Sequence, residues 1–163
     1  VIGSNTDGGM HDIFVSDCAF TGTDVGLRFK SNMGRGGLVN DIYVSNITMR
    51  NIVREAVLFD TYYEDMPAGA TRGKEKPTDK TPEFRDFHIS HIDCQGAATA
   101  VAITGLPQMP VSNIAFDSVT IRARKGLVAT ECRGITLHDV RLDVGEGPAI
   151  RTDRTAEVKV DKE

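Results

Sequence analysis

Tryptophan is absent from this chain, and cysteine and proline are sparse, with three Cys and six Pro among 163 residues. Cys18, Cys94 and Cys132 are odd in number and lack CxxC pairing, so neither a zinc site nor a disulfide framework is predicted, and buried free thiols are expected. No apolar run is long enough to span a bilayer. The formal net charge of −4, without clusters of Lys and Arg, disfavours nucleic acid because counterion release needs such clusters. The expected partners therefore include neither a membrane nor a nucleic acid.

The chain does contain one repeated pattern, a polar residue or glycine followed by alternating apolar positions. Five copies and a shortened sixth occupy residues 10–20, 39–49, 84–94, 111–121, 132–142 and 157–160. Alternation with a period of two, bounded by Gly, Asn and Asp, is typical of strands and turns. Helical spacing of apolar residues is not sustained anywhere. An all-β chain is predicted.

The distance between the copies predicts how the strands are arranged. From copy to copy, the steps 13→42, 42→87, 87→114, 114→135 and 135→158 are 29, 45, 27, 21 and 23 residues. Most of these steps match one coil of a solenoid. Each unit also holds a second short β-rich run, at 25–30, 56–60, 100–103, 126–129 and 148–150. Several strands per coil predict a parallel β-helix of five or six coils.

In that helix one inward column is expected to contain Ile13, Ile42, Phe87, Ile114 and Ile135. A leucine-rich repeat would need a regular Leu and Asn spacing that is missing here. A β-sandwich is the alternative fold, because short strands with regular turn signals look similar.

The longest step contains an insertion of about one coil's length, from Thr61 to Pro82. This segment is rich in Gly, Pro, Lys, Asp, Glu and Thr, which predicts a solvent loop. Long loops that leave a rigid scaffold often frame a binding site. We therefore expect one domain, residues 1–163, made of β-helix coils with a loop insertion at about 61–82.

Two cations stand out in the run from Gly22 to Gly37. Arg28 and Lys30 occupy alternate positions of a strand, so they share one face. Arg offers a planar fork to a carboxylate and Lys a compact charge beside it, so the pair can bind an anion. The alternative is two solvated surface cations, which is the more frequent arrangement.

The same run carries a resemblance to a known family. It contains a G-T-D-x-G-L stretch, then Arg28-Phe29-Lys30, then R-G-G and an N-D-I-Y-V strand. In this order the motifs resemble those of the polygalacturonases, the family-28 glycoside hydrolases, with Arg28-Phe29-Lys30 in place of the family's R-I-K. Downstream, residues 60–63 resemble its D-x-x-Y segment. The resemblance implies a right-handed parallel β-helix of the pectin-lyase-like type, and the later repeats resemble the family's C-terminal coils.

The resemblance also implies roles for three residues. Arg28 and Lys30 would bind the carboxylate of a galacturonate unit of the substrate, and Tyr63 would line the same cleft, with Tyr62 as the alternative tyrosine. Phe29 in place of the family's Ile changes only the inward side chain. The family's chemistry requires no cofactor, and no metal site is expected.

Residues 5–8 spell N-T-D-G, a family motif whose Asp is catalytic, but we do not assign that role to Asp7. In the family the motif lies several coils before R-I-K, with an Asp-Asp pair and a Gly-His-Gly motif between, and this chain contains neither. A polar, glycine-rich turn is expected from Asn5 to Gly9 instead. Inverting hydrolysis needs one carboxylic acid and one carboxylate. We therefore expect no catalytic residue in this chain and interpret it as truncated at its N-terminal end.

The function that the resemblance implies is a pectin-degrading glycoside hydrolase that hydrolyses α-linked galacturonate, secreted or periplasmic, with a polysaccharide or oligogalacturonide as substrate. This chain would supply the carboxylate-binding residues and be inactive alone. The alternative is a noncatalytic carbohydrate-binding or structural β-helix. A pectate lyase would need a calcium site of clustered acids, which is not seen near Arg28. A homodimer through the N-terminal coil is also expected, because the apolar residues Ile13, Val15 and Phe20 would have an open flank.

Overall fold

Each copy of the repeat forms a strand in the computed structural model, which describes residues 1–62, 76–153 and 155–161. These strands are β1 (Met10–Thr21), β3 (Leu38–Arg50), β5 (Glu83–Gln95), β7 (Val111–Ala123), β9 (Cys132–Val144) and β11 (Ala156–Asp161). The second apolar run of each unit forms β2 (Leu27–Lys30), β4 (Glu55–Asp60), β6 (Thr99–Thr104), β8 (Lys125–Thr130) and β10 (Ile150–Thr152). Within the described ranges, no helix could cross a membrane.

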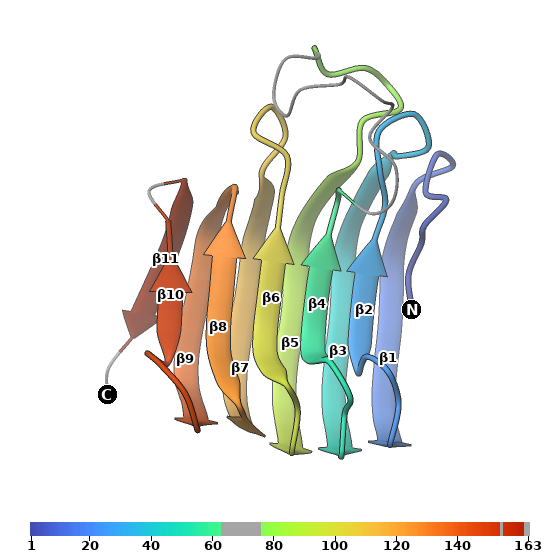
Figure 1. Cartoon of the computed structure of the whole chain (residues 1–163). Helices are drawn as coiled ribbons and strands as arrows, with labels where there is room; N and C mark the ends of the chain where they lie inside the picture. The colour runs from blue at the N-terminus through green and yellow to red at the C-terminus, as the bar shows by residue number, and fades with distance from the viewer. Residues whose placement is uncertain (63–75, 154, 162–163) are drawn as a thin grey trace.

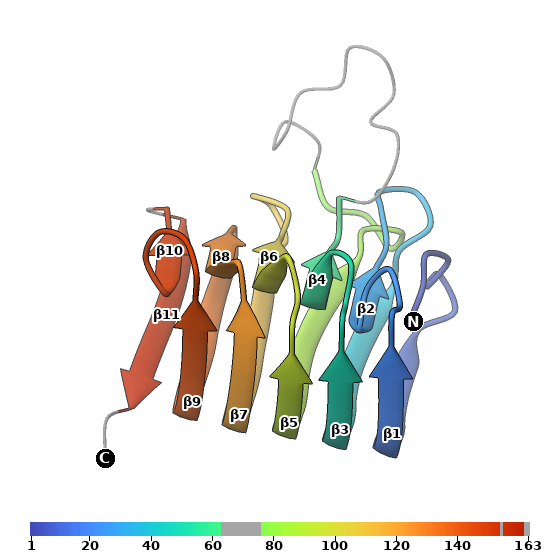
Figure 2. The same cartoon turned by 60° about the horizontal axis from the view of Figure 1, so that its bottom comes forward.

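The strands form two sheets that face each other and extend along one axis, with the sheet of β2, β4, β6, β8 and β10 in front in Figure 1. The six-stranded sheet has the order β1-β3-β5-β7-β9-β11, and the five-stranded sheet has the order β2-β4-β6-β8-β10. All neighbouring strands are parallel. The chain passes from one sheet to the other in each coil, as Figure 2 shows. The parallel β-helix expected from the repeat is confirmed.

The repeat position that Ile13 occupies in the first copy forms one column through the six-stranded sheet. The register pairs Ile13 with Ile42, Ile42 with Phe87, Phe87 with Ile114, and Ile114 with Ile135. All of these except Ile13 are fully buried, and Ile13 lies partly buried at the first coil. The expected inward column is confirmed. The long step between copies does not disturb it, since Ile42 and Phe87 are direct partners.

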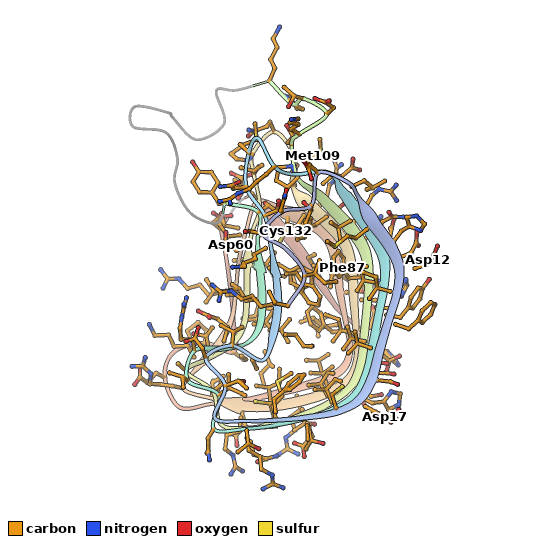
Figure 3. All side chains as sticks on the ribbon, turned by 90° about the vertical axis from the view of Figure 1, so that its right-hand side faces the viewer. Asp12, Asp17, Asp60, Phe87, Met109 and Cys132 are labelled. Carbon is orange, nitrogen blue, oxygen red and sulfur yellow. The ribbon has the colours of Figure 1, made fainter. Side chains whose placement is uncertain are left out.

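Aromatic side chains fill the core at the level of β2, β4 and β5. Phe87 has no exposed surface, and Figure 3 shows it inside the coil. Its ring lies edge-on to Phe29 and Phe59, with centroids 5.0 and 4.9 Å away, and 6.0 Å from Phe84. Edge-to-face pairs at these distances are favourable beyond the area that they bury. Phe29 thus anchors the strand that carries Arg28 and Lys30.

The long strands bend around this core at residues with a left-handed backbone. One such position holds Asp12, Asp41, Asp86, Asn113 and Gly134 in successive coils, and the other holds Asp17, Asn46, His91, Ser118 and Asp139. Their φ angles lie between 47° and 63°. Figure 3 shows Asp12 and Asp17 on the outside of β1, where the ribbon turns. Asn, Asp and Gly adopt this conformation at least cost, so polar residues within the repeat form the corners of the coil.

The three cysteines are all free. Cys94 and Cys132 are buried, and Cys18 is partly buried. Burial disfavours the thiolate and raises the pKa of both Cys94 and Cys132 to about 11. These two side chains therefore act as small apolar groups of the core.

The first coil has apolar surface that no other described residue covers completely. Ile13, Val15 and Phe20 are only partly buried and line a pocket of about 490 Å³ together with Ile2, Leu27 and neighbouring residues. β1 is the outermost strand of the six-stranded sheet. A homodimer through this coil stays a prediction.

Candidate functional site

The strand β2 presents its two cations on the outer surface. Leu27 and Phe29 are buried in the core, so the alternate residues Arg28 and Lys30 point away from it and are partly exposed. β2 pairs with β4 in a parallel register that places Lys30 beside Asp60. The structure therefore brings Arg28 and Lys30 together on the outer face of the five-stranded sheet.

Arg28 belongs to a small charged cluster at the start of β2 and β4. Its Nη1 lies 3.9 Å from Oδ2 of Asp24, and Nη1 of Arg54 lies 3.8 Å from the same oxygen. Arg54 also approaches Glu55, with Nε 3.5 Å from Oε2. The side chain of Arg28 keeps 22% of its surface exposed. Asp24 therefore orients the guanidinium of Arg28 without covering it.

The turns before β2 and β4 hold this cluster in place. The backbone N–H of Arg54 donates to the carbonyl of Asp24 at 2.8 Å, and Val53 donates to the carbonyl of Thr23 at 3.0 Å. These bonds tie two consecutive coils together next to Arg28. Sequence reasoning missed Arg54 and Glu55, because their proximity to Arg28 depends on the register between coils.

The loop after Lys30 is fixed by buried hydroxyls. Ser31 is fully buried, its Oγ donates to the carbonyl of Ser4 at 3.0 Å, and it lies 2.9 Å from Oγ1 of the buried Thr6. Farther along the loop, Nε of Arg35 donates to Oδ1 of Asn32 at 2.8 Å. The position of Lys30 is thus set on one side by β4 and on the other by a hydrogen-bonded loop.

The N-T-D-G stretch forms the turn expected for residues 5–9. Gly9 donates its backbone N–H to the carbonyl of Thr6 at 2.9 Å, and Asp7 is exposed at the tip. Thr6 faces inward to Ser31. Its backbone N–H also bonds to the carbonyl of Arg35 at 2.9 Å, which joins this turn to the loop after β2.

Of the two tyrosines considered from the sequence, only Tyr62 can be placed. It follows Asp60, whose Oδ1 accepts a hydrogen bond from the backbone N–H of Tyr62 at 2.9 Å. Tyr63 lies outside the described residues. The described residues between β4 and β5, 61–62 and 76–82, contain no strand.

The chemistry that this face offers is anion binding. Two outward cations lie on one short strand, and the carboxylate of Asp24 lies beside Arg28. A carboxylate that meets an Arg fork beside a Lys forms charge-assisted hydrogen bonds, which are stronger than neutral ones. No group of His, Cys, Asp and Glu able to hold a metal ion is present in the ranges that the structure describes.

Comparison with known proteins agrees with the family resemblance found in the sequence. The sequence profile described as Glycosyl hydrolases family 28 matches residues 1–153. A polygalacturonase of Ralstonia nicotianae is 40% identical over 107 residues, which is 63% of this chain and 18% of that protein. An exo-poly-alpha-D-galacturonosidase of Dickeya chrysanthemi is 28% identical over 156 residues, 86% of this chain and 25% of that protein. A probable polygalacturonase of Vitis vinifera is 26% identical over 120 residues, 74% of this chain and 23% of that protein. No solved structure matches.

Proposed function

The chain belongs to the glycosyl hydrolases of family 28, and on that premise we propose that it is part of a pectin-degrading hydrolase acting on α-linked galacturonate. It spans about a quarter or less of the curated relatives reported above. The observation that supports its own role is the outward placement of Arg28 and Lys30 on one short strand. Both residues bind the carboxylate of one galacturonate unit.

In this proposal the two cations have different tasks. Arg28, oriented by Asp24, offers two parallel N–H groups to a carboxylate and sets the angle of the sugar ring. Lys30, beside Asp60 in the register, supplies a point charge that tolerates a range of positions. Together they hold the ring by its carboxylate and leave the glycosidic bonds on either side accessible.

The acid and the base that hydrolysis needs belong, in this proposal, to coils outside residues 1–163. The chain contains no Asp-Asp pair and no Gly-His-Gly motif, and Asp7 occupies the tip of a turn. Tyr63 is proposed to contact the same ligand, on the resemblance of residues 60–63 to the family's D-x-x-Y segment alone. We also propose, on the family resemblance alone, that the protein is secreted or periplasmic, which cell fractionation would test.

Calorimetric titration of the chain with trigalacturonate tests the proposal. Arg28→Ala and Lys30→Ala should each weaken binding roughly ten- to a hundredfold, the range that a lost hydrogen bond to a charged group implies. Arg28→Lys should weaken it too, because the fork is lost while the charge remains. Arg141→Ala is the matched control, since Arg141 is exposed on the other sheet. This variant should bind trigalacturonate like the unmodified chain.

The methyl ester of the same trimer separates carboxylate binding from general sugar binding. It should bind weakly to every variant, because the ester carries no charge for Arg28 and Lys30 to recognise. Equal binding of acid and ester, with no effect of Arg28→Ala, would support a noncatalytic carbohydrate-binding β-helix instead.

A further inference from the structure

A column of outward residues links Arg28 to a second arginine at the far end of the five-stranded sheet. The register pairs Arg28 with Leu58, Leu58 with Ala102, Ala102 with Val128, and Val128 with Arg151. The three residues between the cations are apolar. Exposure increases along the column, from 7% at Leu58 to 40% at Val128, so the part near Arg151 is the open part.

A polar column runs beside the apolar one. Lys30 is paired with Asp60, Asp60 with Thr104, and Thr104 with Thr130. The two threonines are partly exposed, so hydroxyl groups flank Ala102 and Val128. A sugar ring has the matching character, because it has apolar C–H faces and hydroxyl groups around its edge. In Figure 1 the sheet faces the viewer, and no described segment crosses in front of it.

Arg151 has the features of an available anion-binding group. It is exposed, and no carboxylate of the described residues lies within ion-pair distance of it. Asp153, the acid nearest to it in sequence, accepts hydrogen bonds from Thr130 at 2.6 Å and from Thr155 at 2.5 Å. The charge of Arg151 is therefore not neutralised by an ion pair within this part of the chain.

The distance between the two arginines sets the size of a ligand that could use both. Four strand steps separate their backbones, or about 19 Å at the usual spacing of strands in a sheet. One sugar ring is much shorter than that, so only a chain of several units can reach from Arg28 to Arg151. A polymer with a carboxylate on every unit would present one of them at each end of the column.

We propose that Arg151, next to Val128 in the register, forms a distal subsite that binds a second carboxylate of the same polyuronate chain that Arg28 and Lys30 hold. This inference rests on the proposed function. It predicts that affinity increases with oligomer length until the ligand spans the column. It also predicts the orientation of the bound ligand, which lies along the solenoid axis across β4, β6 and β8.

The test is a titration of the chain with oligogalacturonates of increasing length. Arg151→Ala should leave the dissociation constant of trigalacturonate unchanged and raise that of the longest oligomers by about three- to tenfold, as expected for one exposed charge-assisted contact. Val128→Asp should also raise the dissociation constant of the longest oligomers, because it places a negative charge in the apolar column, where it repels the carboxylates of the ligand. Arg141→Ala again serves as the control with an equal loss of charge.

The outcomes separate this inference from the proposed function. If Arg28→Ala weakens binding at every length while Arg151→Ala changes nothing, or changes all lengths equally, the distal subsite is wrong and the proposed function stands. If the unmodified chain binds no oligogalacturonate of any length, or Arg28→Ala has no effect, both fail. A loss confined to long oligomers in Arg151→Ala, and absent in Arg141→Ala, supports the subsite.

Discussion

Asn46 donates a hydrogen bond from Nδ2 to Oδ1 of Asp17 at 3.1 Å, which joins the first two coils where both backbones are left-handed. The same relation recurs between Asn113 and Asp86, also at 3.1 Å. At these corners the backbone requires residues that tolerate a positive φ, and the side chains of such residues are short and polar. Asn and Asp at these corners thus both tolerate the bent backbone and link neighbouring coils by hydrogen bonds.

The pKa of Asp17 should respond to loss of the Asn46 amide. Hydrogen bonds from Ser16 and Asn46 lower this pKa, so the carboxylate stabilises the fold above its unfolded pKa of about 3.9, and that contribution is lost as pH falls through the folded pKa. Asn46→Gly removes the amide but keeps the left-handed backbone. We expect the pKa of Asp17, followed by NMR, to rise toward its ordinary value. An unchanged pKa would mean that the bond does not form in solution.

Ser118 has a left-handed backbone with φ of 55°. Serine adopts this conformation at a higher cost than Asn or Asp. Ser118→Gly should therefore stabilise the fold by about 0.5–1 kcal/mol, because the steric strain is relieved. Thr120→Gly, two residues later in the same strand and without a positive φ, should destabilise it by about 0.5–1 kcal/mol. Urea unfolding of the two variants checks the contrast. A loss of stability in both would mean that the positive φ of Ser118 carries little strain.

Phe87→Ala should cost about 3–5 kcal/mol of unfolding free energy, since a buried ring is replaced by a cavity. Phe87 is fully buried among three other Phe rings. Phe14→Ala is the control, because Phe14 is 73% exposed and only stacks on Tyr43 with centroids 4.9 Å apart. Its cost should stay near 1 kcal/mol. Similar losses in both variants would argue against Phe87 as a centre of the core.

The chain of residues 1–163 should release no reducing ends from polygalacturonate, even while it binds trigalacturonate. Holding a carboxylate does not replace the general acid and base, which each contribute orders of magnitude in rate. A reducing-sugar assay at high protein concentration measures this. Activity that persists in Asp7→Asn would point to another acid in the chain, whereas activity abolished by Asp7→Asn would restore the N-T-D-G motif to a catalytic role.

Much of the fold could be predicted from the sequence because a β-helix repeats one local rule. Period-two alternation fixed which side of β2 bears Phe29 and which bears Arg28, and the spacing of the copies placed Ile42 over Ile13. The corners were not predicted, since His91 and Ser118 have no strong preference for a left-handed backbone. Nor was the contact of Arg54 with Asp24, which depends on how two coils are aligned.

Ile42 and Phe87 are direct partners, so the packing of the core does not depend on how many residues separate β4 from β5. Entropy penalises a longer connection only slowly, by about 0.6 kcal/mol for each doubling of its length. This junction is therefore a natural insertion point for protein engineering. A foreign peptide or a small domain could be grafted there, and the solenoid would keep its alignment.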